Sequence, residues 1–290
     1  MNFFAPRGDF PAVGLFSAGH LFMLAGCIVL LFTLCRVFLK ERSGNSYIMI
    51  KVVSVTVLLR EIIKTIWGLS AGHYSDWYEY LPIWFCSLFI PFSLLAGFTK
   101  GSARKLALSF MYYGGLTGGI AYLFFPTTSI GRYPFWHFIT MHSMFYHTVM
   151  IFIALYIVKN GLIKPSIKDL KNYVLTIIVA CIVAFAVNQC LGTNYMFLSK
   201  PANNNVPLQL IAAATGVFYP AVITLCQAFI SFFCSFWRIQ NSDKTLTNFH
   251  TMQVDFFKRK LSGFRRRICT SHRFSNAHSV FIKLSIRIIK

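Results

Sequence analysis

Seven long apolar stretches constrain the fold of this chain more than any other feature. They cover about residues 13–37, 47–69, 81–98, 103–125, 134–158, 172–191 and 207–236. A helix crosses the hydrocarbon core of a bilayer with about 20 mostly apolar residues. Charged residues make up only 12% of the chain, against about 25% in soluble domains. The sequence therefore predicts an all-α polytopic membrane protein, a bundle of seven transmembrane helices.

Basic residues indicate the orientation of this bundle. Most of the 28 Lys and Arg residues fall in the first, third and fifth loops and in the C-terminal segment. On the opposite side we find only Arg7, Arg132 and Lys200. Cytoplasmic loops carry an excess of Lys and Arg in membrane proteins. We therefore expect a multi-pass protein of the cell membrane with its N-terminus outside and its C-terminus in the cytoplasm (N-out/C-in).

The formal net charge of +20 could be interpreted as a nucleic-acid-binding surface. The basic residues are, however, spread over the loops as the topology requires, so we expect no nucleic-acid partner. The sequence divides into a membrane domain, residues 1–236, and a basic cytoplasmic tail, residues 237–290. Polybasic segments next to a membrane rest on anionic inner-leaflet lipid, which is the expected partner of the tail. Binding of another protein is the alternative. The sequence does not indicate an oligomeric state.

The pattern of cysteines and histidines predicts neither a disulfide framework nor a metal site. All eight cysteines except Cys269 fall within predicted spans, and none has metal-ligand spacing. His142 and His147 are five residues apart, not at the i, i+4 spacing of a helical zinc pair. Phosphate-binding and dinucleotide-binding glycine motifs are not found in the sequence. We expect no cofactor and no metal.

Two features inside the spans indicate how the helices pack and where a site lies. Gly114, Gly115, Gly118 and Gly119 form two interleaved small-xxx-small pairs, which let a neighbouring helix approach closely. Ionisable groups in lipid are costly and mark functional positions. With a rise of 1.5 Å per residue, many polar groups fall in one layer in the outer half of the bundle. That layer contains His20, Arg60, Glu61, Lys64, Cys86, His142, Tyr146 and Asn188, with Asn194 and Tyr195 just outside it.

Cys86 and His142 are the candidate catalytic pair in this layer. A thiolate is a strong nucleophile, and an imidazole within hydrogen-bond reach can deprotonate the thiol and later protonate a leaving group. Other members of the layer have structural alternatives. Glu61 and Lys64 stand at i, i+3 and can form an ion pair that joins helices. His20 alone is more often a hydrogen-bonded contact between helices.

Four stretches of the chain resemble a known family in their order and spacing. They are FSAGH (Phe16–His20), LPIWFC (Leu81–Cys86), the run from Gly114 through Pro126 to His142, and GTNYMFLSKP (Gly192–Pro201). Together they resemble the YwaF-like bacterial integral membrane proteins, which are related to the animal transmembrane protein 164 family. The resemblance covers roughly residues 13–236. It implies a seven-helix fold and, for the animal members, glycerophospholipid acyltransferase activity with a cysteine and a histidine.

These catalytic residues would correspond to Cys86 and His142. Trp84 stands where the bacterial pattern has a histidine. The leading hypothesis is a phospholipid acyltransferase or acyl hydrolase acting on membrane phospholipid. In it Cys86 is the nucleophile and His142 the base, while Asn194 or loop N–H groups act as oxyanion donors. Glu61 or His20 would orient the histidine or bind the headgroup.

The alternative is a transporter or small-ligand-binding protein with a polar pocket around Glu61 and His142, lined also by Arg60 and Lys64. A seven-span receptor has only the number and orientation of the spans in its favour.

Overall fold

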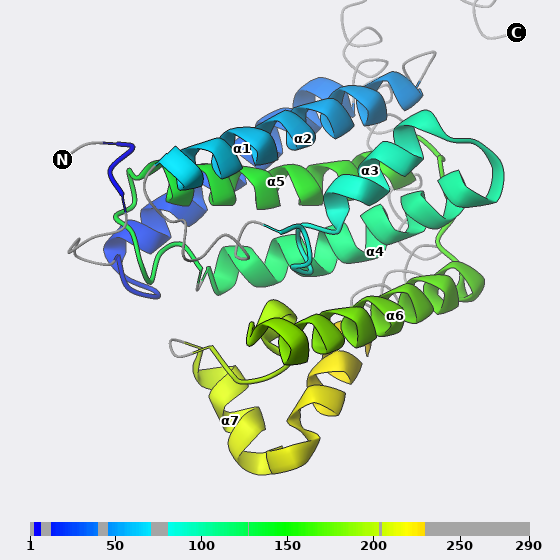
Figure 1. Ribbon diagram of the computed structural model, residues 1–290. Coiled ribbons are helices and arrows are strands. Elements are labelled where there is room, and N and C mark those ends of the chain that lie inside the picture. Colours follow the sequence, from blue (N-terminus) through cyan, green and yellow to red (C-terminus); the bar gives the residue numbers. More distant parts are fainter. Residues whose placement is uncertain are drawn as a thin grey trace, which may run out of the picture. The chain divides into compact units, whose positions relative to one another are not determined.

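The computed structural model describes residues 3–6, 13–39, 46–70, 81–126, 128–202 and 205–229. All regular structure in these residues is helical (Figure 1). The helices are α1 (Ala18–Phe38), α2 (Ser46–Ser70), α3 (Phe89–Phe98), α4 (Gly101–Phe124), α5 (Phe138–Lys159), α6 (Ile167–Leu191) and α7 (Val206–Thr215). Two 3-10 turns are added, η2 (Tyr195–Phe197) and η3 (Gly216–Phe218). The all-α prediction is thus confirmed for this part of the chain. The proposed tail, residues 237–290, lies outside it.

Four stretches of helix are long and apolar enough to cross a bilayer. They are α1, α5, α6 and the segment Val206–Phe229. The large apolar side chains of α1 and α6 are mostly exposed, as they are on a face that meets lipid. The chain is therefore a membrane protein with helical spans. Seven spans, and the N-out/C-in orientation in the cell membrane, stay predictions.

Two predicted spans are not continuous helices. Residues 81–88 form turns, so the expected helix 81–98 begins only at Phe89. Pro91 explains the late start, because its ring would clash with the carbonyl of Ser87 if the helix extended backward. The expected span 207–236 is interrupted at Gly216, whose φ is +53°, and Pro220 stands four residues later. Its last residues, 230–236, lie beyond the described part.

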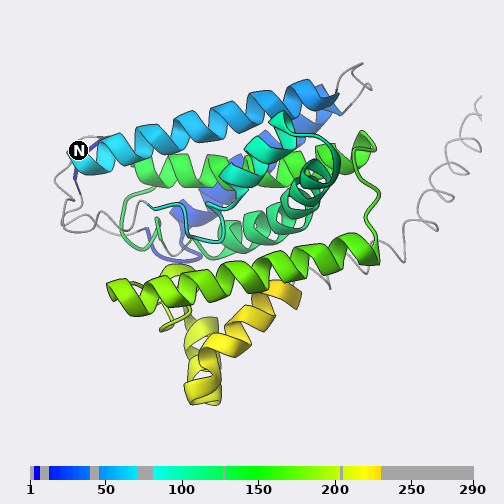
Figure 2. The same cartoon turned by 45° about the vertical axis from the view of Figure 1, so that its right-hand side comes forward.

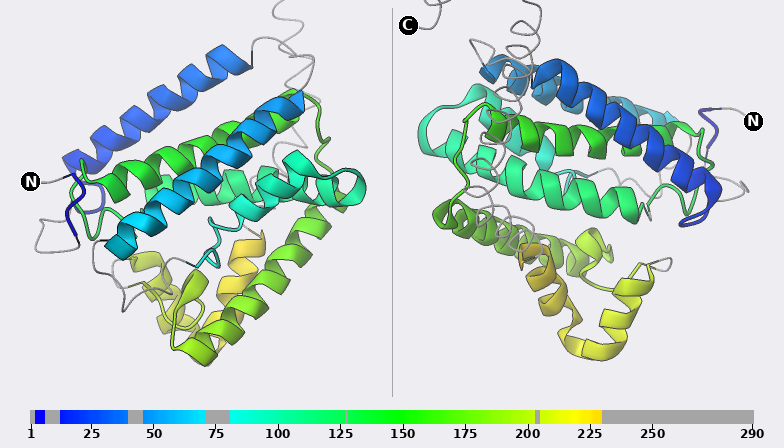
Figure 3. Two further views of the ribbon diagram at one scale, coloured as in Figure 1. Left: turned by 45° about the horizontal axis from the view of Figure 1, so that its top comes forward. Right: turned by 180° about the vertical axis from the view of Figure 1, so that it is seen from behind.

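Helix α4 lies at the centre of the described bundle. It packs against α3, α5 and α6. Helix α1 packs against α5, and α2 packs against α3. Figures 1 and 2 show α4 between α5 and α6, and Figure 3 shows α1 along α5. Every residue of α4 from Ala107 to Gly119 is buried. This burial makes α4 the element against which α3, α5 and α6 are positioned.

The glycines of α4 permit this close packing, as the sequence predicts. A Cβ on Gly115 would lie 3.0 Å from the carbonyl oxygen of Met150, and one on Gly119 would lie 2.9 Å from that of His147. Both carbonyls belong to α5. A Cβ on Gly118 would meet the ring of Phe85 at 2.8 Å. The missing side chains therefore admit the backbone of α5 on one side and the segment before α3 on the other.

Candidate functional site

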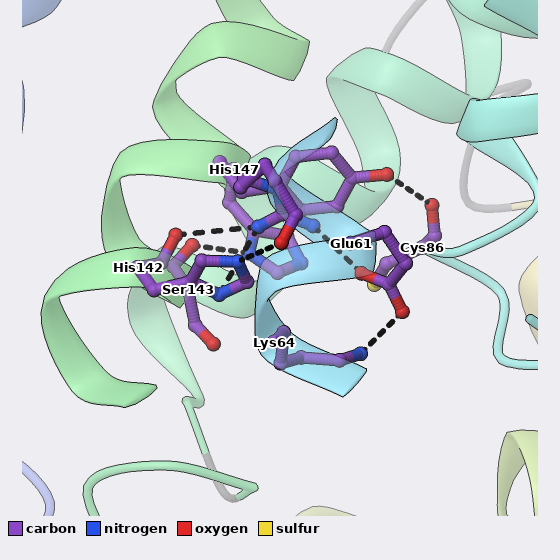
Figure 4. A network of polar contacts seen from close by, with 8 residues as sticks. Glu61, Lys64, Cys86, His142, Ser143 and His147 are labelled. Carbon is purple, nitrogen blue, oxygen red and sulfur yellow. Dashed lines mark hydrogen bonds and ion pairs between the residues drawn. The ribbon is translucent and has the colours of Figure 1, made fainter. Parts of the chain in front are cut away.

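A polar network joins α2 to α5 inside the bundle (Figure 4). Its centre is Arg60, whose Nη2 donates to Oε2 of Glu61 at 3.1 Å. The other oxygen of Glu61 pairs with Lys64, one helical turn further on. The guanidinium carbon of Arg60 lies 3.6 Å from the centre of the Tyr146 ring. Such a cation–π contact is strongest where water is excluded. We call Arg60, Glu61, Lys64, Cys86, His142 and Tyr146 the Arg60 network.

His142 is held by Arg60 through both nitrogens of its ring. Nη1 of Arg60 lies 3.3 Å from Nδ1 of His142 and 3.3 Å from its carbonyl oxygen. Nε2 of His142 lies 3.3 Å from the carbonyl oxygen of Arg60. A guanidinium has only donors, so Nδ1 accepts and Nε2 carries the proton. The imidazole is neutral in this arrangement, and its basic nitrogen faces Arg60.

Cys86 lies in the turns before α3, and its backbone is fixed by α5. The hydroxyl of Tyr146 donates to the carbonyl oxygen of Cys86 at 2.8 Å. Cys86 is half-buried, and the tyrosine that holds its carbonyl also carries the Arg60 guanidinium over its ring. The network therefore connects the residue that carries a candidate nucleophilic sulfur to two cations and one carboxylate.

No direct hydrogen bond joins the thiol of Cys86 to the ring of His142. The two residues are linked through Arg60 and Tyr146, and Figure 4 places them on opposite sides of the network. The sequence predicts that they lie at one level, and the structure brings them into one network. It does not form the contact between thiol and imidazole that the dyad needs. Catalysis by this pair stays a prediction.

His147 is a candidate that reasoning from the sequence set aside. It is 4% exposed, and its Nδ1 donates to the carbonyl oxygen of Ser143 at 2.7 Å. In the neutral ring Nε2 is then unprotonated, and within the described residues this buried atom has no hydrogen-bond partner. The ring of Tyr122 stacks on the imidazole at 3.6 Å between ring centres. A buried imidazole with a bare lone pair is a possible base.

His20 does not join the Arg60 network. Its Nε2 donates to the carbonyl oxygen of Leu123 at 2.9 Å, and its Nδ1 accepts from the backbone N–H of Phe16 at 3.0 Å. Both ring nitrogens are thus used, and the side chain fastens α1 to the end of α4. These contacts support the structural alternative, a hydrogen-bonded contact between helices. They do not support the two roles expected of His20, which are orienting His142 and binding the headgroup.

Asn188, Asn194 and Tyr195 fold the loop that follows α6. Oδ1 of Asn188 accepts from the N–H of Tyr195 at 2.7 Å, and its Nδ2 donates to the carbonyl of Tyr195 at 3.1 Å. The Asn194 amide donates to the carbonyl oxygen of Lys200 and accepts from the N–H of Ser199. The loop therefore uses Oδ1 and one of the two N–H donors of the Asn194 amide, and the oxyanion role of Asn194 stays a prediction.

The same loop packs against the turns that carry Cys86. The ring of Trp84 lies 5.4 Å from that of Tyr195 and 5.5 Å from that of Phe197. Met196 and Phe197 both have φ near +55°, a left-handed conformation that non-glycine residues seldom adopt. Such strain persists only where the surroundings impose it. The loop thus packs on the turns containing Cys86 through Trp84, while the neighbouring Phe85 meets Gly118 of α4.

The described residues hold no group of three His, Cys, Asp or Glu side chains that could bind a metal ion. Comparison with known families gives a match over most of the chain: the TMEM164 family profile matches residues 15–238. The chain belongs to the TMEM164 family. This match confirms the relation to the transmembrane protein 164 family, whereas the YwaF-like bacterial relation gains no support from it. No curated protein and no solved structure matches the chain. The match to the TMEM164 family includes every residue of the Arg60 network.

Proposed function

We propose that this TMEM164-family protein transfers or hydrolyses acyl groups of membrane phospholipids through a thioester at Cys86. The observation that carries the proposal is that Tyr146 joins the backbone of Cys86 to Arg60, and Glu61 joins Arg60 to Lys64, within a helical membrane bundle. The network holds two cations and one carboxylate, so it has a surplus of positive charge. That surplus suits a substrate with a phosphate near its ester groups, as a phospholipid has.

The reaction would proceed in two steps. The sulfur of Cys86 attacks the carbonyl carbon of an acyl ester, so an S–C bond forms and the ester C–O bond breaks. The leaving glycerol oxygen takes the proton that a base has removed from the thiol. A lysophospholipid hydroxyl, or water, then attacks the thioester carbonyl. The C–S bond breaks, the acyl group passes to the acceptor, and the thiol regains its proton.

Substrate binding would free His142 to act as the base. Hydrogen bonds between a guanidinium and a phosphate are charge-assisted and about twice as strong as neutral ones. A substrate phosphate would therefore compete well with the 3.3 Å contact between Arg60 and Nδ1 of His142. Released from Arg60, Nδ1 is an unprotonated nitrogen on the α5 side of the network. His147, whose Nε2 is already bare, is the second candidate for this role.

The decisive experiment measures acyl transfer by the full chain in phosphatidylcholine liposomes. The donor is a phospholipid with a labelled acyl chain, and lysophospholipid is the acceptor. We expect Cys86→Ala to abolish transfer and hydrolysis, whereas Cys190→Ala, at an exposed position on α6, should keep both. Hydroxylamine should release label from the protein with Cys86 and not from Cys86→Ala. Undiminished turnover by a folded Cys86→Ala protein would contradict the proposal.

Two further variants identify the base. General base catalysis raises a rate by about 10²–10⁴-fold. Replacing the essential histidine should therefore slow acyl transfer by at least about 10²-fold. His142→Ala and His147→Ala are compared, each with its thermal unfolding midpoint as a control for folding. The larger loss identifies the base. Full activity of both variants would exclude a histidine base from the reaction.

A transporter or small-ligand binder is the second candidate, favoured by one observation. Arg60, Glu61, Lys64 and His142, which that hypothesis needs in one pocket, do belong to one network. Uptake of an anionic solute into proteoliposomes separates the two candidates. Uptake that survives Cys86→Ala but is lost in Glu61→Gln would favour transport. Acyl transfer without uptake would favour the enzyme.

A further inference from the structure

A second polar region lies at the start of α4, at the opposite end of this helix from Leu123. It is a pocket of about 510 Å³ between the start of α4, the residues after α5 and the start of α6. Protein pockets that hold small ligands usually measure about 300–1,000 Å³. The lining residues that bear on ligand binding are Tyr47, Gly101, Arg104, Lys105, Lys164 and Asp169.

Cations outnumber anions in the lining of this pocket. Arg104, Lys105 and Lys164 contribute three positive charges, and Asp169 contributes one negative charge. Asp169 is 2% exposed and already has partners, since Ser166 donates to its Oδ2 at 2.7 Å and Nζ of Lys105 lies 3.4 Å from its Oδ1. The carboxylate therefore neutralises Lys105, and the charges of Arg104 and Lys164 are left for a ligand.

Arg104 is held in place without being neutralised. Its guanidinium carbon lies 4.2 Å from the centre of the Tyr47 ring, which fixes its plane. Its Nε is buried and has no hydrogen-bond partner among the described residues. An arginine stacked on an aromatic ring presents its N–H groups as a rigid fork that fits the oxygens of a phosphate.

The start of α4 adds to the positive potential at this place. The helix begins at Gly101, which lines the pocket, and its N-cap residue Lys100 makes no side-chain capping bond. The first N–H groups of a helix have no partner within the helix, and the positive end of its dipole favours anions. A Cβ on Gly101 would meet nothing within 4 Å, so the backbone there is open to a ligand.

We propose that this pocket binds a phosphate group, presented by the headgroup of an anionic phospholipid. The chemistry of Arg104, Lys164 and the start of α4 selects a phosphate. We infer a lipid as the source of the phosphate because the pocket lies at the ends of helices in a membrane protein. Basic pockets between transmembrane helices bind anionic headgroups in this way. The proposal does not depend on the reaction at Cys86.

The test uses the full chain in detergent and native mass spectrometry. Phosphatidic acid and phosphatidylcholine with the same acyl chains are titrated separately, and dissociation constants are compared. We expect phosphatidic acid to bind about tenfold more tightly, and Arg104→Gln to remove most of that difference, because hydrogen bonds to charged groups are worth roughly tenfold or more in affinity. Lys164→Gln changes an exposed residue and should weaken binding in the same direction without loss of folding.

Lys168→Gln is the matched control, because it removes the same charge near the start of α6 from an exposed position that does not line the pocket. It should change binding less than about twofold. A loss as large as that of Arg104→Gln would overturn the proposal in favour of general surface charge. Equal affinity of the two lipids would overturn it as well.

Inorganic phosphate at millimolar concentration distinguishes the source of the ligand. If it displaces phosphatidic acid from the chain, the pocket also takes phosphate from solution. If it does not, the lipid is the source. Both results support a phosphate site, provided that Arg104→Gln and Lys164→Gln weaken the binding and Lys168→Gln does not.

Discussion

The Arg60 network and the basic pocket are built from the same kinds of side chain but differ in how their charges are used. Each contains an arginine over a tyrosine ring, Arg60 on Tyr146 at 3.6 Å and Arg104 on Tyr47 at 4.2 Å. Each also contains a lysine beside a carboxylate, Lys64 with Glu61 and Lys105 with Asp169.

What differs is exposure. The side chain of Lys64 is 19% exposed and that of Lys105 is 60% exposed. In the Arg60 network, the Nη atoms of Arg60 have partners on α2 and α5, whereas Arg104 shows only its ring contact among the described residues. The buried Nε of both arginines has no hydrogen-bond partner there. Buried charges must be paired where water is excluded. The same residues can therefore close a network within a bundle and leave a receptive surface at its end.

Removing the carboxylate of each region should have the largest effect and tests this difference directly. Glu61→Gln leaves two cations inside the bundle without their anion, which should lower the free energy of unfolding by about 3–5 kcal/mol. In Asp169→Asn the amide still hydrogen-bonds Ser166 and loses a pair with an exposed lysine, so the loss should be about 1 kcal/mol. Unfolding in graded denaturing detergent measures both, and equal losses would remove the distinction between the regions.

Close packing of α4 against α5 should affect the function of the Arg60 network and not ligand binding in the pocket. A Cβ at position 119 would lie 2.5 Å from Cγ1 of Ile151 and 2.9 Å from the carbonyl oxygen of His147. We expect Gly119→Ala to lower stability by about 1–3 kcal/mol and to reduce acyl transfer, while phosphatidic acid binding stays unchanged. Gly26→Ala is the control, because nothing lies within 4 Å of a Cβ there. A stable, fully active Gly119→Ala protein would contradict the close approach of the helices.

Salt should separate the two regions by a smaller effect. Raising the salt concentration from 0.1 to 1 M shortens the Debye length from about 10 to about 3 Å. Binding of phosphatidic acid at the exposed pocket should weaken severalfold, whereas the stability difference between the unchanged chain and Glu61→Gln should not change. Repeating both measurements at the two concentrations tests this. A salt-dependent stability loss in Glu61→Gln would show that water reaches the Arg60 network.

The sequence predicts the elements of this fold well where one local pattern decides them. The expected span 47–69 is α2, Ser46–Ser70, and the pairing of Glu61 with Lys64 follows from their spacing on one helix. The interruption before α3 was not predicted, since apolar periodicity continues through residues 81–88. Pro91 was the available signal, because proline restricts how far a helix can extend toward its N-terminus.

Contacts across helices are what local patterns leave open. Depth in the membrane places Cys86 and His142 at one level, yet it does not determine which way each ring or sulfur points. Arg60 occupies both nitrogens of His142, and this follows only from the packing of α2 on α5. His147 lies five residues from His142, so the two do not share a helical face, and spacing alone does not connect His147 with the site. Its bare Nε2 depends on Ser143 and Tyr122, which no spacing rule connects.

The position of α1 has a consequence for how the protein is assembled. Among the described residues, its hydrogen bonds to other helices join His20 to Leu123 and Cys27 to the carbonyl of Met144, and both partners are made much later. A chain is synthesised from its N-terminus, and distant contacts wait for their partners. These contacts of α1 cannot form before α4 and α5 have been made. Helix α1 is thus made before the helices that position it.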